Sequence, residues 1–318
     1  MKISIVIASA PDRSTDEILS SLKQIQPKNI EFEILIVKGT HLSVQRNMGI
    51  EKATGEYIFL FDDDVIIPDG IIQKVIMIFE SELKIDVIGG PNLTPPTDNF
   101  LQHCFGYAHA NYFTGLNTSA RYYPANIQKA DENLLIGCNL AFRSEIIKNN
   151  LFDPEMDCND ENEVLNRIIQ KGGNLRYSKD FFVYHHRRKT VSAYIKQIFR
   201  WGIGRTMHFF KHTNNVSPIF LVPLVFVLYL ISLSVYNPGW YLLPAILYIV
   251  LAFSFALQVA IYYKSPFSVF IMPWLFLITH ISYGCGLFWG IILKIYQKPR
   301  PISDRKNFKL TTLSFPTK

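Results

Sequence analysis

The feature that most constrains this chain is a long stretch almost without charge. Between Val216 and Leu293, Lys264 is the only Lys, Arg, Asp or Glu. An α-helix needs roughly 20 apolar residues to span the hydrocarbon core of a bilayer, and three segments approach or exceed that length: residues 218–236, 240–263 and 267–293. Tyr and Trp near the segment ends are typical of membrane interfaces. The sequence therefore predicts a multi-pass protein of the cell membrane, with residues 216–293 as its membrane region.

The charges after the last apolar segment conflict with three full crossings. The tail, residues 294–318, is basic and contains one acid, Asp304. A basic segment favours the cytoplasmic side, whereas three crossings would place it opposite the N-terminal part of the chain. Either one segment is re-entrant or interfacial, or the charge rule fails here. Residues 267–293, which include Pro273, His280 and three glycines, are our candidate for the irregular segment, and the sequence leaves the number of crossings open.

A basic amphipathic segment, residues 190–215, comes directly before the membrane region. Residues 181–215 contain seven Lys or Arg and no acid, and apolar residues from Val191 to Ile198 recur at helical spacing. Such a helix is expected to lie in the membrane interface. Nucleic-acid binding is the other explanation for a basic face, and the bilayer-like sequence that follows argues against it. We expect a lipid bilayer as a partner, and no nucleic acid.

The first part of the chain, residues 1–189, reads as a separate α/β domain. Apolar, β-branched runs alternate with helical patterns, and the runs at residues 3–8, 32–37, 57–61 and 86–90 predict strands. This alternation predicts a mainly parallel sheet with right-handed crossovers. Ser14 and Glu17 predict a capping box for the first helix. Residues 91–132 are irregular and aromatic-rich, and we interpret them either as a variable loop or as a wall or lid beside an acceptor.

The same part of the chain is expected to face the cytoplasm. The apolar run Ile3–Ala8 is too short for the core of a signal peptide. The four cysteines are widely spaced and show no metal-binding pattern, which suits a reducing compartment. We therefore place residues 1–215 on the cytoplasmic side of the membrane.

Three consecutive carboxylates, Asp62, Asp63 and Asp64, directly follow the apolar run at residues 57–61. Open α/β sheets bind ligands at the carboxyl ends of their strands. Acids at alternate positions can hold a hard cation, which in turn holds a diphosphate. The simpler interpretation is a solvated acidic turn before the next helix, since Asp is a common turn residue. The strand pattern places these acids on one rim with Ser9 and Lys38.

Several ordered pieces of residues 2–211 resemble the family 2 glycosyltransferases, which have the GT-A (nucleotide-diphospho-sugar transferase) fold. The resemblance depends on the order and spacing of the pieces, because each alone is weak. They are Ile3–Ala8, Arg46–Gly49, Gly55–Asp64, Gly137–Arg143, Asp160-Glu161 and Gln197–Trp201. In addition, Gly202–Arg205 and His280–Gly290 resemble membrane-attached exopolysaccharide transferases of the succinoglycan-synthesis type.

This resemblance implies a donor and metal site. Asp62 and Asp64 would form a DxD-type motif that binds Mg²⁺ or Mn²⁺ and the donor diphosphate, with His185 as a further metal ligand. An ordinary histidine at the end of a strand is the alternative for His185. The implied contacts to the nucleotide-sugar donor are Ala8, Ser9, Arg46, Asp62, Asp63, Gln197, Arg200 and Trp201. Of these, Gln197, Arg200 and Trp201 match the family's QxxRW motif.

The resemblance also implies a general base in the pair Asp160-Glu161. Members of the family have an acidic pair that opens a helix, and its second member takes the proton of the acceptor hydroxyl. The usual order is Glu-Asp, so position points to Glu161 and residue type to Asp160. We favour Glu161, because a base must lie within hydrogen-bond distance of the proton, and position in the chain governs that distance more than residue type does. Two acids that merely cap their helix are the alternative.

Two departures from the family concern the donor. Lys38-Gly39-Thr40 stands where members usually have acids that read the uracil or ribose, and Ala8-Ser9-Ala10 replaces the usual end of the first strand. The resemblance still implies an inverting transferase that acts on a glycan or polyprenyl-phosphate-linked acceptor in surface polysaccharide synthesis. A processive synthase, a non-catalytic donor-binding membrane protein of the same fold and, more distantly, a nucleotidyl transferase are the alternatives.

Overall fold

The computed structural model divides into two compact units. The first comprises Met1–Pro95, Ala120–His186 and Pro299–Lys318, and the second Pro96–Ser119 and Arg187–Lys298. The structure describes residues 1–25, 30–127, 129–156, 158–211, 217–236, 238–296 and 308–315. Most of the basic tail, and residues 212–216 around the start of the predicted membrane region, therefore lie outside the described residues. The domain boundaries at residues 189, 215 and 293 remain predictions.

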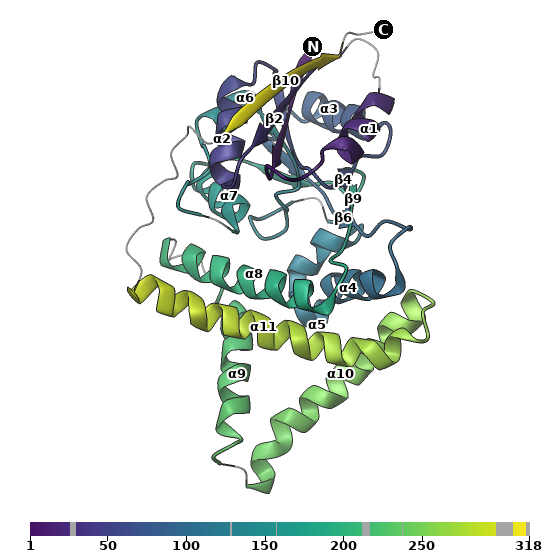
Figure 1. Cartoon of the computed structure of the whole chain (residues 1–318), viewed down its shortest axis with the longest axis vertical. Coiled ribbons are helices and arrows are strands. Elements are labelled where there is room, and N and C mark those ends of the chain that lie inside the picture. The colour runs from purple at the N-terminus through teal and green to yellow at the C-terminus, as the bar shows by residue number, and fades with distance from the viewer. Residues whose placement is uncertain are drawn as a thin grey trace. The chain divides into compact units, whose positions relative to one another are not determined.

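The first unit is built on a mainly parallel, seven-stranded sheet, which confirms the predicted α/β class (Figure 1). Its strand order is β10-β2-β1-β3-β7-β5-β8. Strand β1 pairs in parallel with β2 and β3, and β5 pairs in parallel with β8. Strand β7 is antiparallel to both β3 and β5. The strands are β1 Lys2–Ser9, β2 Glu31–Lys38, β3 Tyr57–Asp62, β5 Val87–Gly89, β7 Asn139–Arg143, β8 Leu175–Tyr177 and β10 Lys309–Phe315.

Helices cover both faces of this sheet, because successive strand residues point to opposite faces. Ile3, Ile5 and Ile7 of β1 pack in one buried cluster with α1 and α3. Val6 of the same strand packs in a second cluster with α2, α6 and α7. The helices are α1 Asp16–Gln24, α2 Leu42–Lys52, α3 Ile71–Ser81, α6 Ser144–Lys148 and α7 Asp160–Gln170. The continuous apolar runs in the strands follow from this burial on both faces.

Two local features of the first unit differ from prediction. The first helix begins at Asp16 without a side-chain cap, because the Ser14 hydroxyl accepts the N–H of Asp16 and Glu17 contacts His186. A small second sheet of order β4-β9-β6 was also not predicted. Its strands are β4 Val65–Ile66, β6 Asn92–Leu93 and β9 Val183–His185.

Strand β10 is the largest departure from the sequence prediction. Residues 309–315, which we expected only as part of a basic tail, pair antiparallel with the whole length of β2 from Phe32 to Lys38. Leu310 and Leu313 add apolar contacts to the two faces of the sheet. We did not predict this strand from the sequence, because polar residues separate its two leucines and leave no continuous apolar run.

The segment 91–132 is not an irregular loop. It contains α4 Phe100–Ala110, α5 Tyr112–Gly115 and the 3₁₀ helix Leu116–Tyr122. Helix α4 begins with a capping box between Asn99 and Gln102. Cys104, Phe105 and Ala108 of α4 are buried among helices of the second unit. This apolar face explains why the segment folds, and Phe105 is among its packed aromatic residues.

The second unit is helical, and α8 and α11 run side by side in it (Figure 1). Tyr194 of α8 contacts Thr279 of α11, and Thr206 contacts Leu287, so the two helices run in the same direction. Helices α9 and α10 form a hairpin that packs on α11. The helices are α8 Val191–Lys211, α9 Val222–Ser232, α10 Leu243–Tyr262 and α11 Ser268–Tyr296, with 3₁₀ turns Pro218–Leu221 and Gly239–Leu242.

The apolar helices correct the predicted segments. In the described residues, Gly239–Tyr262 and Ser268–Tyr296 are long and apolar enough to cross a membrane, whereas Pro218–Ser232 is shorter. The candidate irregular segment is one uninterrupted helix, α11, although Pro273 lies inside it. Its glycines lie inside this helix, at points where neighbouring helices approach closely. A Cβ on Gly202 or Gly286 would collide with the backbone of the facing helix.

Candidate active site

The carboxyl ends of the parallel strands bring three of the predicted donor residues, Ala8, Ser9 and Asp62, to one edge of the first unit. Ala8 of β1 is in register with Asp62, the last residue of β3. Ser9 is in register with Lys38, the last residue of β2. The three aspartates therefore leave the sheet at the edge where open α/β folds bind ligands.

Asp62, Asp64 and His185 form a cluster that fits a divalent cation. One possible ligand atom from each lies within 4.8 Å of the others. His185 Nε2 is 3.0 Å from Asp64 Oδ1, because β9 pairs with β4 and places His185 opposite Val65. His185 Nδ1 is buried and has no hydrogen-bond partner among the described residues. Two carboxylates and one imidazole suit Mn²⁺, and the carboxylates suit Mg²⁺.

Asp63 has different partners from the acids on either side of it. Its buried carboxylate accepts hydrogen bonds from Ser9 Oγ at 2.8 Å and from Arg13 Nη1 at 2.9 Å. Arg13 Nη1 also lies 3.1 Å from Asp64 Oδ2. Asp63 and Asp64 raise the pKa of Arg13 against the opposing effect of its burial, with the hydrogen bond to Asp63 contributing most. Asp63 therefore anchors the acidic turn to the loop after β1.

Arg46 joins the acidic turn to the predicted base pair. Its guanidinium lies 2.9 Å from Asp160 Oδ2 and 3.1 Å from Asp62 Oδ1, and it donates to the carbonyl of Gly137 at 3.0 Å. Burial opposes the charged form of Arg46, but the nearby carboxylates outweigh it and raise its pKa. A Cβ on Gly137 would lie only 3.0 Å from this guanidinium. The buried arginine therefore fixes the two acidic groups relative to each other.

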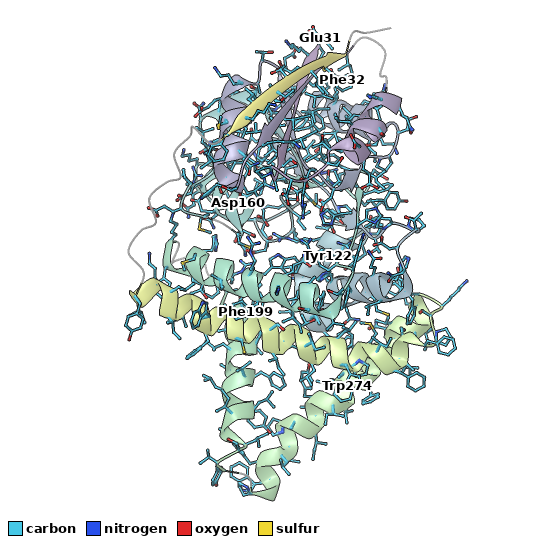
Figure 2. All side chains as sticks on the ribbon, viewed as in Figure 1. Glu31, Phe32, Tyr122, Asp160, Phe199 and Trp274 are labelled. Atoms are coloured by element: carbon cyan, nitrogen blue, oxygen red, sulfur yellow. The ribbon has the colours of Figure 1, made fainter. Side chains whose placement is uncertain are left out.

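Asp160 and Glu161 both lie in the first turn of α7, but their environments differ (Figure 2 labels Asp160). The Asp160 side chain is 2% exposed and is held by Arg46 and by Ser43 Oγ at 3.2 Å. The Glu161 side chain is 13% exposed and meets Arg121 at 3.4 Å. Among the described residues, the Asp160 carboxylate is held by partners on two sides. Glu161 has one ion pair, and that pair is longer.

The pKa values of two of these carboxyls are shifted in the same direction. Burial raises the pKa of Glu161, and Asp160 adds to the shift while Arg121 and Arg46 oppose it. Burial also raises the pKa of Asp62, with Arg46 opposing. A raised carboxyl pKa favours proton uptake near neutral pH. For Asp62, a bound cation would oppose protonation.

The three QxxRW residues lie on α8, in the second unit. Arg200 is exposed, and the ring of Trp201 packs 5.1 Å from that of His109. Their role in donor binding therefore stays a prediction that rests on the motif.

Two arginines of the site were missed by sequence reasoning. Arg13 lies in the loop after β1, where the sequence drew attention only to Ser9 and its neighbours. Arg121 contacts Glu161 and donates to the carbonyl of Asn133 at 2.7 Å. It lies in the segment that we interpreted as a loop or lid. Arg13 could have been noticed, because it belongs to a loop at the predicted ligand rim that also carries the acids. No feature of the sequence pointed to Arg121.

Comparisons with known proteins concern the family and the fold of this chain. Residues 1–204 match the family model described as "Glycosyltransferase like family 2". No sequence among the curated proteins matches significantly. The mannosyltransferase PcManGT from Pyrobaculum calidifontis, solved with GDP-Man and Mn²⁺, has a similar fold: the TM-score is 0.55 at 14% identity, over 92% of this chain and 87% of that one. TarS 1–349 from S. aureus, solved with UDP-GlcNAc, gives a TM-score of 0.47 at 12% identity, over 93% and 92%.

Proposed function

Because this chain belongs to glycosyltransferase family 2, and is thus a glycosyltransferase, we propose that it is an inverting, metal-dependent enzyme. It moves a sugar from a nucleotide-diphosphate donor to a hydroxyl of a lipid-linked glycan during surface polysaccharide synthesis. The observation that carries the proposal is the continuous network of Asp64, His185, Asp62, Arg46 and Asp160 at one edge of the sheet. A solvated acidic turn would not require a buried arginine between two acidic groups.

In this proposal, Asp62, Asp64 and His185 hold Mn²⁺ or Mg²⁺. A bound divalent ion would offset the charge that develops on the departing nucleoside diphosphate. The Mn²⁺ in the mannosyltransferase structure supports this choice of cation class. Asp63 keeps the turn in place through Ser9 and Arg13, and Arg46 prevents Asp62 from turning away.

Glu161 acts as the general base. It accepts the proton of the acceptor hydroxyl as the oxygen attacks the anomeric carbon and the bond to the nucleoside diphosphate breaks. Its raised pKa and its single ion pair support this role. Asp160 is the positioning residue, because Arg46 and Ser43 hold it.

The apolar helices of the second unit support a membrane location and a lipid-linked acceptor. Large apolar side chains remain exposed along α9 and α10, including Val225, Leu228, Leu247 and Phe253 at 50% or more. Such a surface fits lipid, since soluble proteins rarely expose contiguous apolar patches of this kind. Basic residues of α8 fit the headgroup layer.

Strand β10 supports an even number of crossings. It follows the membrane region in the chain but pairs with β2, which precedes that region. Paired strands share one side of a membrane, so three crossings conflict with this pairing. We propose that the α9–α10 hairpin enters the bilayer and returns, while α11 lies in the interface alongside α8. Both ends of the region then face the cytoplasm, as the basic tail predicts.

The transfer reaction is tested with the detergent-solubilised full chain and a panel of nucleotide sugars. We expect release of nucleoside diphosphate that requires Mn²⁺ or Mg²⁺ and a lipid-linked acceptor. Asp64→Ala should lower kcat about 10²- to 10³-fold, the range lost when a group that stabilises transition-state charge is removed. Asp69→Asn, on an exposed turn, is the control. Full transfer by Asp64→Ala would refute the site, and release of pyrophosphate would indicate nucleotidyl transfer.

The arrangement in the membrane is tested by labelling single cysteines in a cysteine-free chain with an impermeant maleimide. Ser265→Cys between α10 and α11, and Thr312→Cys on β10, should react in inverted vesicles and not in intact cells. Ser234→Cys at the hairpin tip reports whether the tip reaches the outer face. Reaction of Thr312→Cys in intact cells would contradict the even number of crossings.

A further inference from the structure

Arg121 contacts both a turn of the chain and the first turn of α7. Its guanidinium donates through Nε to the carbonyl of Asn133 at 2.7 Å and through Nη2 to the carbonyl of Glu132 at 3.3 Å. The remaining terminal nitrogen, Nη1, lies 3.4 Å from Glu161 Oε1. The Arg121 side chain is 10% exposed, so water competes little for these donors. Two backbone acceptors therefore fix the plane of the guanidinium and direct its third donor at Glu161.

The turn that holds Arg121, residues 131–134, is itself fastened in place. Asp131 Oδ1 accepts the backbone N–H groups of Asn133 at 2.8 Å and of Leu134 at 3.0 Å. The Leu134 side chain is buried in the apolar cluster that includes α7. Asn162, which follows the proposed base on α7, donates to the carbonyl of Glu132 at 2.6 Å. The turn is thus a fixed platform joined to the helix that carries the base.

The contact between Arg121 and Glu161 is longer than a fully formed ion pair. Charge-assisted N–H···O distances are about 2.7–2.9 Å, and Arg46 meets Asp160 at 2.9 Å. Arg121 Nη1 stays 3.4 Å from Glu161, and closing this distance would strain the bonds of the guanidinium to its two carbonyl groups. Glu161 is therefore oriented by a positive charge without a short hydrogen bond that would compete with an acceptor hydroxyl.

The charges around Glu161 give Arg121 a further effect. Burial raises the pKa of Glu161, and among the nearby charges Arg121 opposes that shift most. Arg46 opposes it less, and Asp160 adds to it. The Glu132 carboxylate accepts a hydrogen bond from a side chain of its own turn at 2.9 Å. Arg121 is thus the positive group whose loss should change the titration of Glu161 most.

We propose that Arg121 is a positioning residue of the transfer reaction, which uses the turn at residues 131–134 as a platform from which it orients the Glu161 carboxylate. This rests on the proposed function, because Arg121 acts through Glu161 and has a role only if Glu161 is the general base. Orientation matters, since a displacement of about 1 Å at a reacting group costs as much as about 10²-fold in rate. A lysine would keep the charge but lacks the planar fork that two carbonyl groups hold.

The experiment is the pH profile of kcat for the detergent-solubilised full chain and for Arg121→Met and Arg121→Lys. Activity is read as nucleoside diphosphate released in the presence of Mn²⁺, a polyprenyl-phosphate-linked glycan and whichever donor the wild type uses, with GDP-mannose and UDP-GlcNAc among those offered. In Arg121→Met the acidic limb should move to higher pH by about one unit, because a positive charge no longer favours the carboxylate. The plateau should fall about ten-fold, because the base is no longer held.

Arg121→Lys separates orientation from charge. Its acidic limb should stay near that of the wild type, while its plateau should still fall about three-fold or more, since the fork is lost. The KM for the donor should be unchanged in both variants. Arg167→Met is the matched control, because it removes another arginine–glutamate pair of α7, Arg167 with Glu163 at 2.7 Å. It should lower thermal stability and leave the acidic limb in place.

The outcomes distinguish this inference from the proposed function. If both Arg121 variants keep the wild-type limb and plateau while Glu161→Gln loses the limb, the role of Arg121 is wrong and the proposed base stands. A fall in thermal stability with an unmoved limb in Arg121→Met would also overturn it, as a purely structural role. If Arg121→Met does not fold, Arg121→Lys decides, and a wild-type plateau would contradict the positioning role. If Glu161→Gln keeps the limb, or the wild type releases no nucleoside diphosphate, the proposed base or the proposed function fails, and this inference fails with it.

Discussion

The acidic site of the first unit and the contact between α8 and α11 of the second pair their buried polar groups in different ways. In the first, Arg46 is buried between Asp62 and Asp160, so full charges are held together inside the protein. Between α8 and α11 of the second, the hydrogen bonds join neutral groups, such as Tyr194 with Thr279 at 2.7 Å. Buried charges require nearly complete compensation by their partners, whereas neutral pairs tolerate a missing partner better. The difference teaches that the first unit keeps its buried charges around the proposed metal and donor site.

The largest effect is expected at Glu161, the proposed general base, which lies next to Asp160 of the charged network. Glu161→Gln should lower kcat about 10³-fold with little change in donor affinity, as for loss of a general base. A base acts deprotonated, so wild-type kcat should fall as pH drops through the pKa of Glu161, which burial holds above the usual range. The pH profile of kcat tests this, and Glu161→Gln should lose the acidic limb.

Asp160→Asn is the companion to that variant. It removes charge from the group that Arg46 and Ser43 hold, so it should lower thermal stability and donor affinity as well as kcat. If Asp160→Asn alone removed the acidic limb of the profile and Glu161→Gln kept it, the assigned roles would be reversed.

The next effect concerns the cost of breaking the charged network. Arg46→Met should destabilise the first unit by about 3–5 kcal/mol, because it leaves two carboxylates near each other without their cation. The unfolding transition of the purified chain gives this value. Added Mn²⁺ should restore part of the loss by neutralising Asp62, and an equal loss at all Mn²⁺ concentrations would separate the network from the metal site.

The smallest effect is expected in the neutral seam between α8 and α11. Thr279→Val removes the hydroxyl that lies 2.7 Å from the Tyr194 hydroxyl and should cost about 1–3 kcal/mol. Adding Tyr194→Phe should recover part of this, since the double variant removes both hydroxyls of the pair. A loss as large as that of Arg46→Met would break the comparison between the units.

Much of the first unit could be predicted because its strands are buried on both faces. Runs such as Ile3–Ala8 and Tyr57–Phe61 are continuous and apolar, and the acids that follow β3 mark the ligand edge. Of the candidate site, the residues at or directly after strand ends could be brought together from the sequence: Asp62, Asp64 and His185 lie close to one another. Arg13 and Arg121 could not be found in this way, because their contacts depend on loop geometry.

The second unit was harder to predict, since apolar composition specifies burial or lipid contact and not helix direction. Nothing in residues 267–293 distinguishes a crossing helix from one that runs alongside α8. The position of α11 depends on glycine contacts between distant residues, such as Gly202 with Gly286. Helix α4 was missed because its apolar face is short and is completed by Tyr194 and Ile198 of α8. Strand β10 was missed because its pairing partner lies far away in the sequence.

That distance has a consequence for how the protein is made. Strand β2 leaves the ribosome roughly 270 residues before β10, its neighbour in the finished sheet. At the usual rate of synthesis, this separation corresponds to tens of seconds during which one side of β2 has no strand to bond with. Such an edge is a template for pairing with other chains. Insertion of the intervening helices into a membrane during this interval would hold nascent chains apart, so overproduction without sufficient membrane should yield aggregates rather than folded soluble protein.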